Sequence, residues 1–174
     1  MLAVKIKSFI PFVLVLLIVF CSCGRSPQSV KVRGLYLGMP MDDAVKRVEE
    51  IYRQVEGSRF QTLKWRQWDS FSAHTDHEPE MDITITNSDN GIRFICFNPG
   101  LVDRLFDSAS LSAEQLARWF AEEYHLSALK HHVNRNPPQP EHYWEYNSSQ
   151  GWKVFITQTK TLVFQDWRPR ENDK

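Results

Sequence analysis

Two segments of the 174-residue chain place apolar residues three and four positions apart, and this spacing predicts two amphipathic helices. Residues 41–55 follow Pro40, which suits a first helical turn, and precede Gly57, which suits a helix end. Residues 113–125 follow Ser112, which begins a capping-box pattern. Each helix has only one apolar side, so both need a second layer to pack against.

Apolar residues alternate through most of the remaining chain, and this alternation is typical of half-buried strands. In residues 92–97 we expect Ile92, Phe94 and Cys96 to share one buried face. The expected strands cover residues 60–71, 81–86, 92–97, 101–106, 126–133, 143–146, 152–157 and 161–167. The predicted class is therefore α+β, with two helices packed on antiparallel sheet within a single domain, residues 33–167.

The same order of elements, one helix and then about four strands, occurs twice and suggests repeats over residues 33–106 and 107–167. The five residues from Gly91 resemble the five residues from Gly151, sixty positions later. The two helices are offset by about seventy-two residues instead. The sequence leaves open both a tandem duplication and a chance similarity of two hairpins.

The first 23 residues differ sharply from the rest of the chain. Lys5 and Lys7 precede an uncharged apolar run, residues 9–20. As a helix these residues would span about 18 Å, which is shorter than the hydrocarbon core of a membrane at about 30 Å. The pattern favours a signal peptide over an uncleaved membrane anchor.

Residues 20–24 resemble a bacterial lipobox, in which a small residue precedes the cysteine that receives the lipid. Ser22 is the small residue and Cys23 is the lipid acceptor, whereas the bulky Phe20 makes Cys21 the poorer candidate. The resemblance implies that residues 1–22 are removed and that Cys23 is diacylated. Ordinary secretion without a lipid is the other alternative.

Removal of residues 1–22 leaves 19 basic and 21 acidic side chains, a formal net charge of −2, which argues against a nucleic-acid partner. Cys96 is then the one cysteine besides the lipid acceptor, so no intramolecular disulfide is expected. Residues 23–32 predict a polar tether and residues 168–174 a charged tail. Gly24, rather than Asp, implies sorting to the outer membrane, facing the periplasm.

The entry to the first helix, residues 32–44, is similar to the opening of many small bacterial envelope lipoproteins, with matches at Gly34, Leu37, Gly38 and Met39. The chain thus resembles the SmpA/OmlA-type and β-lactamase-inhibitor-like modules, in which helices pack against an antiparallel sheet. The resemblance implies a non-catalytic binding or assembly module with an envelope protein as partner, and it transfers no binding residue. We expect Gly38 in a tight turn and Met39 folded onto the sheet.

The chain offers one weak metal-binding pattern and no clear catalytic one. His74, Asp76 and His77 have donor types that suit a divalent cation, although a solvated acidic loop is the favoured alternative. The adjacent His131 and His132 should point to opposite faces of a strand. No phosphate-binding loop, dinucleotide fingerprint or zinc-protease motif occurs, so we expect no catalytic residue and no cofactor.

Aromatic residues provide the candidate binding surface. Trp65 and Trp68 lie among polar residues, and Tyr143, Trp144 and Trp152 flank a predicted hairpin. The alternative is that the tryptophans fill a thin two-layer core. We therefore expect a lipid-anchored protein-binding module, with a lipoprotein that binds cell-wall glycan or metal as the alternative and a cryptic hydrolase as a third hypothesis.

Overall fold

The computed structural model describes residues 29–56, 64–67, 71–74, 78, 81–88, 91–135 and 141–167. Within them the chain forms three helices and one eight-stranded antiparallel sheet, which confirms the predicted α+β class. The helices are α2 (Met41–Glu56), α3 (Pro99–Phe106) and α4 (Ala113–Glu123). The strands are β1 (Lys64–Gln67), β2 (Phe71–His74), β3 (Ile83–Ser88), β4 (Gly91–Phe97), β5 (Lys130–Asn134), β6 (Glu141–Asn147), β7 (Trp152–Thr157) and β8 (Leu162–Asp166).

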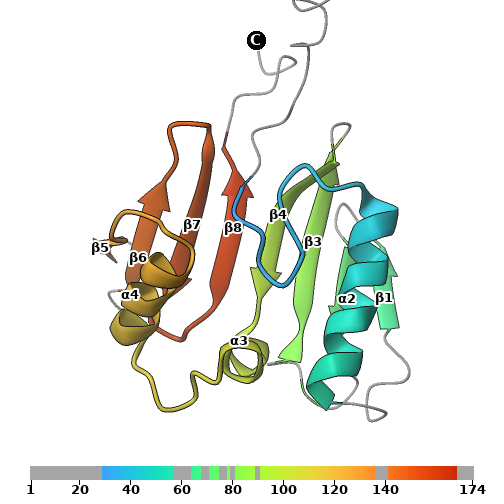
Figure 1. The fold of residues 1–174 in the computed structure, drawn as a ribbon, viewed down its shortest axis with the longest axis horizontal. Helices are drawn as coiled ribbons and strands as arrows, with labels where there is room; N and C mark the ends of the chain where they lie inside the picture. Colours follow the sequence, from blue (N-terminus) through green and yellow to red (C-terminus); the bar gives the residue numbers. More distant parts are fainter. Residues whose placement is uncertain are drawn as a thin grey trace, which may run out of the picture.

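The strands are ordered β1-β2-β3-β4-β8-β7-β6-β5 across the sheet. The last strands of the two halves, β4 and β8, therefore meet at the centre, while β1 and β5 form the two edges. Figure 1 shows α2 and α4 in front of the sheet, each over its own half, and α3 near the end of β4. All three helices add buried side chains to one hydrophobic core between the helices and the sheet.

The two predicted helices are confirmed. The buried side of α2 contains Ala44, Val48, Ile51 and Tyr52, and the Tyr52 hydroxyl donates to the carbonyl oxygen of Met81 at 2.5 Å.

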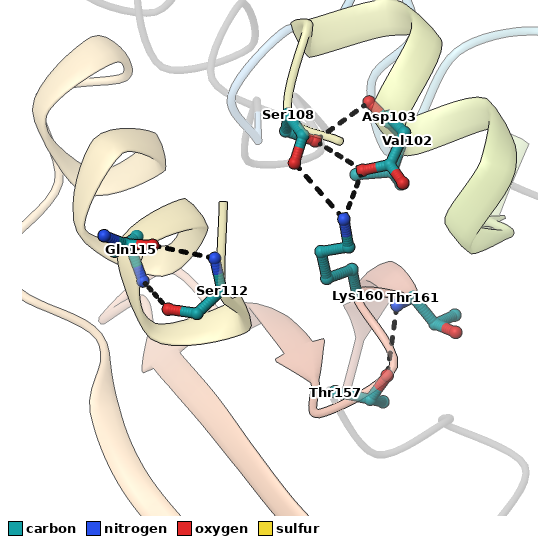
Figure 2. Close-up of polar contacts among 8 residues, drawn as sticks. All are labelled: Val102, Asp103, Ser108, Ser112, Gln115, Thr157, Lys160 and Thr161. Carbon is teal, nitrogen blue, oxygen red and sulfur yellow. Dashed lines mark hydrogen bonds and ion pairs between the residues drawn. The ribbon is translucent and has the colours of Figure 1, made fainter. Parts of the chain in front are cut away.

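Helix α4 begins with the predicted capping box, shown in Figure 2. The Gln115 amide donates to the Ser112 hydroxyl at 3.2 Å, and the Ser112 amide donates to the Gln115 side chain at 2.8 Å. The helix ends at Glu123, two residues earlier than predicted, and His125 follows in a left-handed conformation at φ 53°. That conformation cannot continue a right-handed helix. The helix therefore ends before the end of the apolar pattern from which it was predicted.

The helix entry adopts the predicted tight turn. Gly38 has φ 85°, a left-handed value that favours glycine. Its amide donates to the Ile92 carbonyl at 2.7 Å, and the Ile92 amide donates to the Met39 carbonyl at 2.9 Å. Met39 is half-buried against the core, so this turn joins α2 to the start of β4.

The folded domain begins earlier than predicted. Ser29 and Val32 are buried, the Leu37 amide donates to the Ser29 hydroxyl at 2.8 Å, and Val32 forms a β-bridge with Leu35. The prediction of a tether over residues 23–32 is thus wrong for residues 29–32, because Ser29 and Val32 are buried and Val30 packs against the core. Residues 1–28 and the tail 168–174 lie outside the described residues.

The predicted strand at residues 101–106 is wrong, because these residues belong to helix α3. Pro99 occupies the start of the helix after Asn98, and Leu101, Val102 and Leu105 are buried at helical spacing. Proline fixes φ near the helical value and needs no amide donor in a first turn, which favours the helix.

The described part of the first half still has four strands, because the region predicted as one strand at residues 60–71 contains β1 and ends at Phe71, where a second, unpredicted strand, β2, begins.

Strand β4 also presents its residues differently from the prediction. A register shift opposite Thr86 and Asn87 inserts one extra residue into β4. Ile92 is consequently buried with Ile95, whereas Phe94 is half-buried and lies on the other face. Simple alternation fails here because a bulge changes the face on which the following residues lie.

Candidate binding face

The strand register divides the sheet residues into two faces, since directly paired residues of antiparallel strands point to the same side. One face carries the core rows. One of these rows consists of Ile83, Phe97, Leu162, Ile156 and Trp144. The first four are buried and Trp144 is half-buried against them, so this is the face that the helices cover.

The opposite face, here called the open face, carries three rows of residues that are mostly half-buried. None of the described helices contributes its buried side chains to it. One row contains Phe94, Gln165 and Lys153, and a shorter row contains Thr157, Tyr143 and His132. The central row contains Thr84, Cys96, Val163, Phe155, Glu145 and Lys130.

Aromatic rings gather on the open face over β5, β6 and β7. His132 stacks on Tyr143 with ring centroids 5.2 Å apart and an interplanar angle of 15°. Tyr143 meets Phe155 edge to face with centroids 6.3 Å apart. The Lys153 ammonium lies 5.7 Å from the centre of the Phe155 ring, within the range of a cation–π contact. The result is a continuous aromatic surface across three strands.

An ion pair borders this aromatic surface. Lys153 Nζ lies 3.9 Å from Glu145 Oε2, and their side chains are 27% and 16% exposed. Pairs that are partly open to water contribute about 0–1 kcal/mol each, so a partner can exchange these contacts at little cost. The open face thus combines rigid aromatic rings with charges of both signs, as protein-binding surfaces commonly do.

The aromatic residues predicted from the hairpin do not form one surface. Tyr143 lies on the open face, whereas Trp144 and Trp152 are paired with core-face residues. Trp152 is only 5% exposed and belongs to the hydrophobic core, so its prediction as a binding residue is wrong. Trp144 is half-buried against the same core. The physical reason is the pleat of the strand, which sends neighbours such as Tyr143 and Trp144 to opposite sides.

The other candidates belong to the less fully described part of the chain. The backbone of Trp65 lies in β1 and that of His74 ends β2. Trp68, Asp76 and His77 lie outside the described residues, as does the lipid acceptor Cys23. Within the residues that the structure describes, no group of three or more His, Cys, Asp or Glu side chains is placed to hold a metal ion.

The adjacent His131 and His132 do point to opposite faces, as predicted, because His131 is paired with Trp144 and His132 with Tyr143.

The thiol of Cys96 is half-buried on the open face and forms no disulfide. Burial raises the pKa of Cys96 to about 11, because desolvation disfavours the thiolate. Since the thiolate is the reactive form, this cysteine is a poor nucleophile near neutral pH. The predicted core position is wrong, since the bulge in β4 turns Phe94 and Cys96 away from the helices.

The sequence did not single out Phe155, Lys153 or Glu145 as candidates. Alternation in β7 already places Lys153, Phe155 and Thr157 on the side opposite Val154. The sequence pattern does not give the register that sets Glu145 beside Phe155, because pairing between strands depends on the whole sheet.

A polar cluster fixes the β7–β8 turn, as Figure 2 shows. Lys160 Nζ lies 2.6 Å from Asp103 Oδ1 and donates to the Ser108 carbonyl at 3.2 Å. The Ser108 hydroxyl donates to the same Asp103 oxygen at 2.9 Å. Within the turn, the Thr161 amide donates to the Thr157 hydroxyl at 3.0 Å. These bonds tie the ends of β7 and β8 to the residues around α3.

No helix among the described residues has the length and apolar character needed to cross a membrane. Comparison of the chain with protein-family models, with curated proteins and with solved structures found no match. The likeness of residues 32–44 to envelope lipoproteins therefore stays a prediction from the sequence.

Proposed function

We propose that this chain is a non-catalytic, lipid-anchored module that binds a protein partner in the bacterial envelope through the open face. The observation that carries the proposal is the one-sided covering of the sheet: the helices pack on one face, while Tyr143, Phe155 and His132 form an aromatic surface on the other. Aromatic side chains bury a large area at little entropic cost, which is why they dominate protein interfaces.

A protein partner fits this face better than a nucleic acid or a small ligand. The aromatic rings spread over β5, β6 and β7 in neighbouring rows of a sheet. The accompanying charges are balanced, with Lys153 beside Glu145, whereas a phosphate backbone favours an excess of basic side chains. A partner with an apolar centre and charged residues around it would complement these rows.

The lipid attachment at Cys23 would hold this surface close to a membrane. Only residues 24–28 separate Cys23 from Ser29, where the described fold begins. Five residues reach at most about 18 Å when fully extended. We propose that the anchor places the module at the periplasmic side of the outer membrane and restricts its partners to proteins found there.

Reversal of the open-face charge in Lys153→Glu is expected to reduce recovery of the partner at least about tenfold, since one desolvated hot-spot contact is worth 1.4 kcal/mol or more. The new carboxylate would face Glu145 and would lose the contact with the Phe155 ring. The measurement is quantitative crosslinking in the native host, followed by purification of the full chain and mass spectrometry.

Arg118→Glu is the control, because it also reverses one charge of an ion pair, in this case one whose side chains are 67% and 64% exposed. Arg118 lies on α4, 3.2 Å from Glu114 and away from the open face. Both variants are compared at a temperature well below their measured thermal midpoints, so that loss of folding does not lower the recovery of the partner. Equal recovery of the partner with both variants would argue against binding through the open face.

A further inference from the structure

Two histidines meet across the edge of the sheet, on the side opposite the aromatic surface. His131 Nε2 of the edge strand β5 lies 3.0 Å from His142 Nδ1 of the neighbouring strand β6. The ring centroids are 5.2 Å apart and the ring planes differ by 11°. The distance between the centroids nearly equals the distance between the two nitrogens plus the centroid-to-nitrogen distance of each ring. The imidazoles therefore meet edge to edge in a nearly common plane. The two ring nitrogens therefore face each other directly, as a hydrogen bond between them requires.

A transition-metal ion requires a related but slightly wider arrangement of the same two nitrogens. Without a metal ion, one imidazole donates its N–H to the unprotonated ring nitrogen of the other. Zinc–nitrogen distances of 2.0–2.1 Å and a tetrahedral angle place two imidazole nitrogens about 3.3 Å apart. The observed separation of 3.0 Å is a few tenths of an ångström shorter than that value, and each ring must also turn so that its lone pair points at the ion instead of at the other ring. Rotations about the side-chain bonds supply both changes. A metal ion can thus take the place of the shared proton.

We propose that His131 and His142 form a binding site for a divalent transition-metal ion of the Zn²⁺, Ni²⁺ or Cu²⁺ type. Imidazole nitrogen suits these ions, whereas Mg²⁺ and Ca²⁺ prefer oxygen ligands. His131 is exposed and His142 is half-buried, so an ion can reach the site and water can complete its coordination. This cation site is separate from the predicted loop site at His74, Asp76 and His77.

Metal binding at this site would strengthen the edge of the sheet. The ion would link β5 to β6 in addition to their backbone hydrogen bonds, and Trp144 packs against His131 with ring centroids 5.1 Å apart. Because β5 has only one neighbouring strand among the described residues, a second attachment should oppose its separation from the sheet. An ion that binds only the folded chain also stabilises the fold by mass action.

The test is calorimetric titration of the full chain with Zn²⁺ alone, using detergent-solubilised protein that carries no polyhistidine tag and has been treated with a chelator. All proteins carry His74→Ala and His77→Ala, so that the predicted loop site cannot contribute. We expect one Zn²⁺ per chain. His131→Gln and His142→Gln should each weaken binding at least about tenfold, since loss of a mere second-shell partner already costs about 10–100-fold.

His132→Gln is the matched control, because this residue is adjacent on the same strand and faces the other side. It should leave Zn²⁺ affinity unchanged. The thermal midpoint provides a second measurement: Zn²⁺ should raise it in the parent and in His132→Gln, but not in His131→Gln or His142→Gln. Unchanged affinity in the two ligand variants, or no binding to the parent, would show that the histidines form a hydrogen-bonded pair only.

Discussion

Replacement of Phe164 by alanine is expected to lower the free energy of unfolding by about 3–5 kcal/mol, the usual cost of removing a fully buried aromatic ring. Phe164 is 1% exposed and lies in β8, at the junction of the two halves of the sheet. Its ring contacts Phe97 of β4 at 6.2 Å and Phe120 of α4 at 6.0 Å between centroids. The alanine variant would leave a cavity where both halves and the helix layer meet.

Trp167→Ala is the control for this experiment, because it removes a larger aromatic ring that is 52% exposed. The Trp167 amide still donates to the Gly151 carbonyl in that variant, so the backbone pairing is retained. A surface change of this kind should alter stability by less than about 0.5 kcal/mol. Urea unfolding of both variants measures the difference, and similar losses would contradict the assignment of Phe164 to a shared core.

The second large effect is expected from Cys23→Ala, which should abolish lipidation and move the protein from the membrane fraction to the soluble fraction. Each buried methylene of an acyl chain contributes about 0.8 kcal/mol to membrane binding, and stable anchoring needs two such chains. Loss of the acceptor thiol removes both chains at once. The measurements are incorporation of labelled palmitate and fractionation of cells that express the variant.

Cys21→Ala is the matched variant for the anchor, since Cys21 is the rival acceptor two residues earlier. It should retain both labelled palmitate and membrane association. Loss of label in Cys21→Ala with retention in Cys23→Ala would move the anchor to Cys21. A parent protein that is soluble and unlabelled would support ordinary secretion instead.

Helices and strands that are marked by a short sequence pattern could be predicted well. Helix α4 has its capping box at Ser112, and β7 alternates buried and half-buried residues from Trp152 to Thr157 as expected. The errors occur where a local pattern admits two interpretations. Residues 101–106 contain apolar residues that suit a strand, and the helix start at Pro99 decides the outcome.

The candidate site could be predicted only in part, because it depends on pairing between distant strands. The aromatic pattern predicts Tyr143 as a binding residue, but it equally predicts Trp152, which lies in the core. His131 and His142 are eleven residues apart, and only the register of β5 and β6 brings their nitrogens together. No short-range pattern encodes that contact, since it is a property of the assembled sheet.

A tandem duplication of residues 33–106 and 107–167 stays a proposal, and it is now supported by different observations. The strand order is symmetric about the β4–β8 pair. Two copies of a unit made of one helix and four strands would produce this order. The similarity between the segments at Gly91 and Gly151 gives no support, because Gly91 begins the fourth strand of its half and Gly151 precedes the third.

A photocrosslinking scan in living cells tests whether the partner binds the open face. A photoreactive residue is placed in turn at Lys153, Phe155 and Thr157 on β7, and at the exposed positions Arg53 of α2 and Arg118 of α4. We expect an adduct of one size from each β7 position and none from the helices. Adducts from the helix positions, with none from β7, would contradict the proposal.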